Sequence, residues 1–376
     1  MRLRTALQRS RYFPSLITEL LITDYSRSTS HPLRITNQLA TPMRSYLWYF
    51  LRRLGQFVLV VFVGINIVFF VTHATPIDPV EQAINSATQF GQSDPRAVEI
   101  MRKALRELYG LDGTLWQQYL TFWKRLATGD FGPSISAFPT PVSTMIGRAL
   151  PWTVGLLSTS TLIAWCTGNF MGGLAGYYRK SRLLKAAGIV ATGLQPIPSY
   201  IMSLVVLILF GYLWPILPIS GGFEMNVPPG LTFAFMSSVV THSLLPVLSL
   251  ALITIGGWFV GMRSLVSNIV AEDYVVYAEL AGVDRHRILT SYVMRNALAP
   301  QLTGLALSLG GIFNGAIITE VVFGYPGLGT LLVRGVNSGD YSLVLGIASI
   351  SIIAVAAAVF AIDLVYPLLD PRVKVR

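Results

Sequence analysis

The sequence contains few charged residues and a single cysteine. Only 12% of its 376 residues are Asp, Glu, Lys or Arg, whereas 53% are hydrophobic, and the mean hydropathy is +0.58. This composition excludes an ordinary soluble domain and indicates a protein of the lipid bilayer. The lone Cys166 excludes an intrachain disulfide and a cysteine-cluster metal site, and we expect it to be a small buried apolar residue.

Several sequence motifs for nucleotide binding, catalysis and metal binding are also missing. No Gly-x-x-x-x-Gly-Lys-Ser/Thr segment is present, so the chain has no P-loop to hold phosphates. The absence of Gly-x-Ser-x-Gly and His-Glu-x-x-His argues against an intramembrane enzyme, and the 4 histidines lie in separate segments without metal-ligand spacing. We therefore expect no catalytic residue, no metal site and no cofactor bound by this chain.

Six apolar runs are long enough to cross a bilayer, which requires about 20 residues at about 1.5 Å each. They are roughly Leu54–Ala74, Pro151–Tyr177, Ala186–Trp214, Val239–Gly261, Leu298–Phe323 and Ser342–Leu368. Gly and Pro within them do not disqualify a span, because neighbouring helices can satisfy the freed backbone groups. The sequence thus predicts an all-α integral membrane protein with six transmembrane helices.

Lys and Arg residues indicate how these spans are oriented. The net charge of +10 arises mostly from short segments beside the apolar runs, which is typical of orientation signals rather than of nucleic-acid binding. The second-to-third and fourth-to-fifth connections are rich in basic residues, whereas 215–238 has none and 324–341 has only Arg334. The basic connections and both termini should therefore face the cytoplasm.

The segment 75–150 should then be an extracytoplasmic subdomain. Val98, Met101, Leu105 and Leu108 would share one face of a helix from Pro95 to Tyr109, begun by Asp94 and Pro95. A disordered linker is the alternative, but it fits poorly with a cluster of four aromatic residues, Trp116, Tyr119, Phe122 and Trp123. Residues 1–42 are expected to be a disordered extension, or to precede a start at Met43 with an amphipathic lead into the first span, 43–74.

A polar segment from Glu272 to Pro300 lies between the fourth and fifth spans, within a loop that we place at 264–297. It can form a short helix, a turn at Gly282, and a second helix that leads into the fifth span. Gly282 suits a position of positive φ or close backbone approach, and Ala278 and Ala281 are expected to be exposed beside it. The alternative is a solvated loop whose charges only keep it out of lipid.

This segment resembles the coupling loop of ABC importer permeases of the dipeptide/oligopeptide/nickel family. The resemblance rests on Glu272-Asp273-Tyr274-Val275, Ala278, Gly282 and then Arg295-Asn296-Ala297-Leu298 with Pro300. Other stretches resemble the same family: 109–119, 129–132 with 140–142, 323–329 with 340–341, Asp363, and 370–372. The long region after the first span is typical of the B-type subunit. Val276 and Tyr277 stand where the wider permease motif has an acidic residue and an alanine.

The resemblance implies a type I ABC importer permease fold, with a core at 151–368 and a cytoplasmic tail at 369–376. It implies a bacterial inner-membrane subunit that moves di- or oligopeptides inward, with ATP and Mg held by two separate ABC ATPase subunits. A second homologous permease and an extracytoplasmic solute-binding protein would complete the system. The residues expected to couple to the ATPase are Glu272, Asp273, Tyr274, Ala278, Ala281, Gly282, Val283, Arg295 and Asn296. The alternatives are import of oligosaccharides, opines or another small solute, and a free-standing channel.

Polar residues inside spans are candidates for the translocation path, because placing them in lipid costs free energy. They are Asn66, Asn169, Gln195, Asn314 and Glu320, with His73 and His242 near span ends. Hydrogen bonds between helices are the alternative role. We expect Asn314 and Glu320 to line the path, and for Glu320 an ion pair with Arg334 is the competing prediction.

Overall fold

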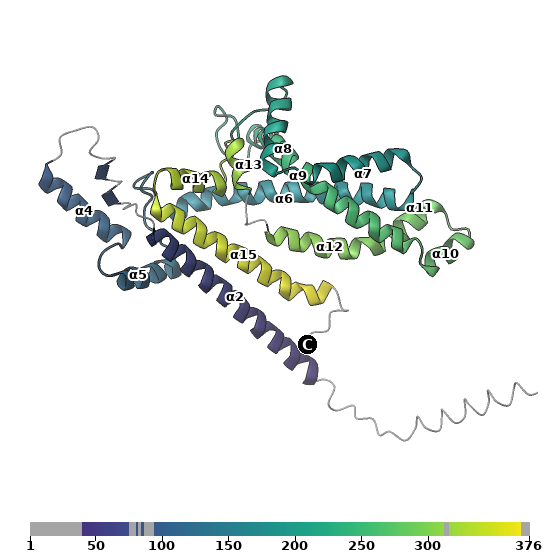
Figure 1. The fold of residues 1–376 in the computed structure, drawn as a ribbon, viewed down its shortest axis with the longest axis horizontal. Helices are drawn as coiled ribbons and strands as arrows, with labels where there is room; N and C mark the ends of the chain where they lie inside the picture. The colour runs from purple at the N-terminus through teal and green to yellow at the C-terminus, as the bar shows by residue number, and fades with distance from the viewer. Residues whose placement is uncertain (1–39, 75–79, 82–83, 86–93, 312–315, 370–376) are drawn as a thin grey trace, which may run out of the picture. The chain divides into compact units, whose positions relative to one another are not determined.

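The computed structural model describes residues 40–74, 80–81, 84–85, 94–311 and 316–369, with side chains described from 47 to 365 (Figure 1). The chain divides into two compact units, residues 1–52 with 374–376 and residues 53–373, and the contacts given below are all within the second. The described secondary structure is helical, apart from one isolated bridge between Pro133 and Pro141. The all-α prediction is thus confirmed for these residues, whereas the extension 1–39 and the tail 370–376 lie outside them.

Four helices are long and apolar enough to cross a membrane: α2 (Ala40–Ala74), α6 (Val142–Tyr177), α9 (Phe233–Ile269) and α15 (Tyr341–Leu369). They confirm the first, second, fourth and sixth predicted spans. With 36 and 37 residues, α6 and α9 are longer than predicted. At about 1.5 Å per residue each is about 55 Å long, more than the hydrocarbon core of about 30 Å. Each of these two helices is therefore longer than a single crossing of the hydrocarbon core requires.

The third predicted span is not one straight helix. It comprises α7 (Arg182–Leu194), then α8 (Ser199–Leu207) with the π-helical η2 (Ile208–Leu213), and the two parts meet at 112°. Pro196 and Pro198 lie at the break, where proline removes backbone donors and restrains the preceding residue. The fifth predicted span comprises α12 (Arg295–Gly310) and α13 (Ile317–Val322), with 312–315 outside the described residues.

Glycines allow α6 and α9 to pack closely. A Cβ atom on Gly168, Gly172 or Gly176 would lie 2.4 to 2.9 Å from the backbone of α9, the shortest distance being 2.4 Å from Gly172 to the carbonyl oxygen of Phe259. This spacing of small residues every fourth position is a common helix-pairing device in membranes. Helices α9 and α7 also pack closely at a glycine, because a Cβ on Gly256 of α9 would lie 2.3 Å from the Ala191 oxygen of α7.

The predicted helix after the first span is confirmed as α4 (Pro95–Tyr109), and the Asp94 carboxylate accepts the Arg96 N–H at its start. It is followed by α5 (Leu115–Thr128), which begins with a capping box formed by Thr114 and Gln117. Val80, Ile84 and Tyr109 form a small buried core with Val98, Met101 and Leu105 against it. Leu108, which shares the predicted helix face with the last three of these residues, is exposed, and Tyr109 occupies the buried position. The described residues of this segment thus pack around a small core.

A buried aspartate fastens this region to the last span. The Asp340 carboxylate accepts hydrogen bonds from the Ser136 N–H at 3.0 Å, the Ser136 hydroxyl at 2.9 Å and the Leu343 N–H at 3.1 Å, and it also accepts one from the Ser134 hydroxyl. Burial, together with the Asp340 carboxylate, raises the pKa of Tyr109 to about 12. The hydrogen bonds of Asp340 therefore join residues that are 204 and 206 positions apart in the sequence at the start of α15.

Candidate functional site

The loop between α9 and α12 folds as a helix, a tight turn and a second helix, as predicted. The first helix is α10 (Asp273–Leu280), preceded by Glu272 as its N-cap. Its end is a Schellman motif: the Gly282 N–H donates to the Glu279 oxygen at 3.0 Å, and the Val283 N–H donates to the Ala278 oxygen at 3.1 Å. Gly282 has a φ of 75°, which confirms the positive φ expected there.

The second helix begins directly after this turn. The Asp284 carboxylate accepts the N–H groups of His286 at 2.9 Å and Arg287 at 3.4 Å, and so caps the helix. The chain then continues without a break through α11 (Arg285–Arg287), the π-helical η3 (Ile288–Met294) and α12. The second helix of the loop and α12 are therefore one continuous helical segment.

The base of the loop is a buried apolar cluster. Its members come from α9, α10 and the second helix: Met262, Val266, Val275, Ala278, Ile288, Val293 and Ala297. Ala278 is only 7% exposed, so the expectation that it is exposed is wrong. Val275 and Ala278 are three residues apart and share the inward face of α10, whereas Ala281 and Gly282 lie on the surface.

Two parts of the sequence motif meet in the structure. The Asn296 amide nitrogen donates to the Tyr274 hydroxyl at 3.0 Å and to the Tyr292 carbonyl oxygen at 2.7 Å. Tyr274 is on α10 and Asn296 is in the first turn of α12, so this hydrogen bond joins the two helices of the loop. Glu272, Asp273 and Arg295 are exposed around it.

The outer face of α10 carries large apolar side chains that the sequence reasoning missed. Tyr277 is 70% and Leu280 is 79% exposed, three residues apart on one side of the helix. An added Cβ on Gly282 would meet no atom within 4 Å, so the surface beside the turn is open. Two large exposed apolar side chains on one side of a helix in a polar loop make this face a candidate contact surface. Their spacing within a polar loop was the signal available in the sequence.

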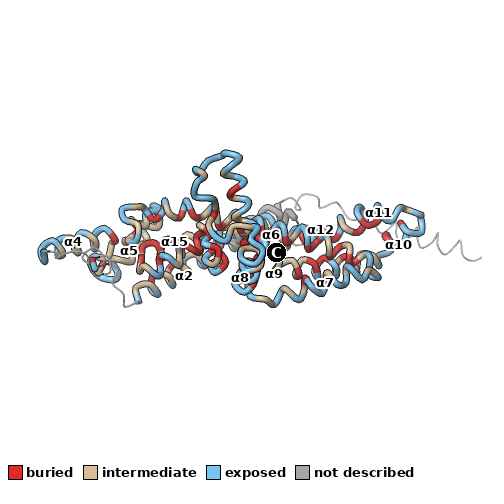
Figure 2. The backbone as a smooth tube through the Cα atoms, turned by 90° about the horizontal axis from the view of Figure 1, so that it is seen from above, coloured by how far each residue is buried: buried red, intermediate tan, exposed pale blue. Residues whose placement is uncertain are grey.

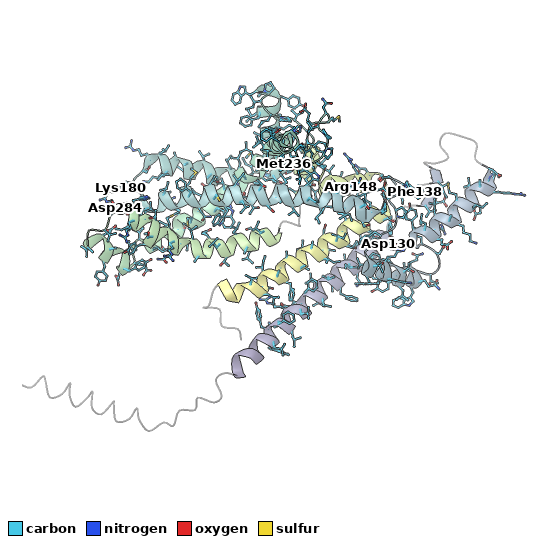
Figure 3. The ribbon with its side chains drawn as sticks, turned by 180° about the vertical axis from the view of Figure 1, so that it is seen from behind. Asp130, Phe138, Arg148, Lys180, Met236 and Asp284 are labelled. Atoms are coloured by element: carbon cyan, nitrogen blue, oxygen red, sulfur yellow. The ribbon has the colours of Figure 1, made fainter. Side chains whose placement is uncertain are left out.

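The loop is also tied to the connection between α6 and α7. The Tyr177 hydroxyl donates to the Arg285 oxygen at 3.4 Å, and the Arg179 guanidinium donates to the Ser267 oxygen of α9 at 2.6 Å. Figure 3 labels Lys180 of that connection and Asp284 of the loop at the same end of the helices. The base of the loop is therefore packed against α9, whereas its tip is exposed. The burial colours of α10 and α11 show the exposed tip (Figure 2).

Of the two residues expected to line the path, Asn314 lies outside the described residues. Glu320, on α13, is fully buried. Its carboxylate accepts the Thr153 hydroxyl at 2.7 Å and the N–H groups of Gly329 at 2.6 Å and Thr330 at 3.3 Å, at the start of α14 (Leu328–Asn337). The ion pair with Arg334 is not formed. In this structure Glu320 caps the start of α14.

The other polar residues of the spans divide into two groups. Asn66 and His73 of α2 bond to other helices, Asn66 accepting the Tyr119 hydroxyl at 2.9 Å and the His73 Nε2 lying 3.0 Å from the Tyr341 hydroxyl. Asn169 donates to its own helix, and its Oδ1 atom is buried without a hydrogen-bond partner. Cys166 is exposed on α6, so the prediction that it is buried is wrong.

These features define a multi-pass, all-α membrane protein with a helical loop between two of its long segments. Residues 168–375 match the family model described as the binding-protein-dependent transport system inner membrane component, and the chain belongs to this family of membrane permeases. It is 25% identical over 329 residues to the dipeptide transport system permease protein DppB of Lactococcus lactis, covering 87% of this chain and 99% of that protein. It is 29% identical over 346 residues to the Escherichia coli protein of the same name, covering 87% and 99% respectively. The oligopeptide transport system permease protein AppB of Bacillus subtilis is 28% identical over 317 residues, covering 84% and 95%.

Proposed function

We propose that the chain is the B-type translocation subunit of an ATP-driven importer of di- or oligopeptides, with six spans and both termini in the cytoplasm. The family match supports the transport role, and the names of the relatives, dipeptide and oligopeptide permeases, support the cargo. Energy would come from two separate ATPase subunits that hold ATP and Mg. A second permease and an extracytoplasmic solute-binding protein would complete the complex, and Asn314 and Glu320 remain candidates for the path.

The loop built from α10 and the start of α12 would be the contact with an ATPase. The observation that carries this assignment is the contrast between its exposed tip, Tyr277 and Leu280, and its buried base around Val275 and Ala278. A partner can bind the tip, while the base moves with α9 and α12. Such coupling needs an element that passes motion on without deforming, and a packed base meets this requirement.

Cross-linking tests the docking surface with a matched control. In a Cys166→Ala background, Leu280→Cys should cross-link to the ATPase subunit in the assembled complex. Leu183→Cys on α7 is the control, because Leu183 and Leu280 are both 79% exposed. The coupling role fails if the two positions cross-link equally, or if Gly282→Asp leaves ATPase assembly and transport unchanged.

Transport in proteoliposomes tests the rest of the proposal. Uptake of a labelled dipeptide should require the ATPases, ATP and the solute-binding protein together. Transport by the purified chain alone would instead establish a channel. Binding of an oligosaccharide rather than a peptide by the solute-binding protein would keep the importer role and change its cargo.

A further inference from the structure

Helix α5 lies against the spanning helix α2 instead of standing apart from it. Trp123 stacks on Phe62 with ring centroids 5.7 Å apart, and Tyr119 stacks on Phe70 at 6.2 Å. The Tyr119 hydroxyl also donates to the Asn66 side chain at 2.9 Å. Figure 1 shows α5 beside the C-terminal part of α2.

The residues that α5 contacts are at bilayer depth. The candidate span within α2 has 28 residues, Leu47–Ala74, and is about 42 Å long, so at most about 12 Å of it can extend past a hydrocarbon core of about 30 Å. Phe62 lies 12 residues before Ala74, which is about 18 Å along the helix. Even if the whole excess is at this end, Phe62 is inside the core by about 6 Å, and any tilt places it deeper.

The surface of α5 has three sides. Tyr119, Phe122 and Trp123 face α2. Trp116 and Leu120, which are 65% and 51% exposed, lie on the adjoining side at helical spacing.

The third side of α5 is polar. Gln117 and Thr128 are exposed there, while Gln118 donates to the Leu111 oxygen at 2.8 Å and Arg125 donates to the Leu108 oxygen at 2.8 Å. The exposed Lys124, four residues after Leu120, is at the border between this side and the apolar one. One edge of α5 therefore contacts the segment that precedes it. At the other edge Trp116 stacks on Tyr119, and Tyr119 stacks on Phe70 of α2, which is 52% exposed, so the exposed apolar surface is continuous from α2 to α5.

We propose that α5 is an interfacial membrane helix, with Trp116 and Leu120 seated at the boundary between phospholipid headgroups and acyl chains at the C-terminal end of α2. Three observations carry this assignment: the depth of Phe62, the continuity of the apolar surface from α2 to α5, and the tryptophan and tyrosine content typical of membrane interfaces. The lipid surface would fix the height of the subdomain that α4 and α5 form. The proposal does not depend on the transported solute or on the ATPase contact.

Spin-label accessibility tests this placement in the full-length protein in phosphatidylcholine nanodiscs. In a Cys166→Ala background, a nitroxide at Leu120→Cys should be relaxed more by oxygen, which concentrates in lipid, than by a water-soluble nickel chelate. Lys103→Cys, at an exposed position on α4, is the control and should be relaxed more by the chelate. Stronger relaxation by the chelate at Leu120 would overturn the proposal, and so would protection from both reagents, which would indicate a covering protein.

A second measurement avoids the labels. Acyl-chain brominated phosphatidylcholine should quench the fluorescence of the parent protein more than that of Trp116→Phe, because the conservative variant removes one fluorophore close to lipid. Equal fractional quenching in the two proteins would contradict the proposal.

Discussion

Gly282 offers the sharpest test of the loop, because its two possible roles can be separated by substitution. Its φ of 75° is unfavourable for residues with a Cβ, while an added Cβ would touch nothing within 4 Å. Gly282→Ala should therefore destabilise the turn by about 1–2 kcal/mol, and this free energy comes from the backbone conformation alone. Asn tolerates this conformation better than Ala, so Gly282→Asn should lose less.

Hydrogen exchange measures this cost where it arises. The amides of residues 282 and 283 donate to the end of α10, and a loss of 1–2 kcal/mol corresponds to about a 5- to 30-fold faster exchange through local opening. Gly282→Ala should show this acceleration, and Gly282→Asn should stay close to the parent. Equal acceleration in both variants would refute the argument from φ.

ATPase binding then reports on the second role of Gly282. If the turn matters only through its shape, Gly282→Asn should assemble with the ATPase as well as the parent does. If the partner needs the bare backbone at this open surface, Gly282→Asn should weaken assembly without changing amide exchange. Normal assembly of Gly282→Ala, with amide exchange accelerated, would show that the turn is not part of the contact.

Substitutions at three further sites have outcomes that follow from the contacts at each position. Gly172→Ala should destabilise the purified protein by about 1–3 kcal/mol, because its Cβ would lie 2.4 Å from a backbone oxygen of α9, whereas Gly155→Ala, with nothing within 4 Å, should keep or raise the melting temperature. Glu320→Gln places an amide donor among buried N–H donors and should cost about 1–3 kcal/mol; a normal melting temperature with lost transport would instead assign Glu320 to the path. Tyr274→Phe should cost about 0.5–1.5 kcal/mol and speed amide exchange in α10, and unchanged exchange would show that its bond to the start of α12 does not hold the loop.

The sequence located several features correctly because they depend on local rules. Apolar windows marked the four long helices, Asp94 and Pro95 marked the start of α4, and Gly282 marked a turn of positive φ. These signals act over one or a few helical turns and do not require knowledge of the neighbours.

Predictions that required knowledge of neighbours failed. Cys166 was expected inside and is exposed, and Ala278 was expected outside and is buried, because the side of a helix that is covered depends on what packs there. The third span bends by 112° at a pair of prolines, although prolines inside α6 and α9 are accommodated without a break. Sequence alone did not distinguish these cases.

From its sequence the protein was recognisable as a bilayer protein with a polar, glycine-centred loop between two spans, because hydropathy and backbone preference are properties of the chain itself. Only the tertiary structure decided that Tyr274 meets Asn296, that Glu320 caps α14, and that α5 lies along α2. Each of these pairings joins residues that are from 9 to more than 50 positions apart. No periodicity encodes such contacts, because they arise only when separate helices pack together.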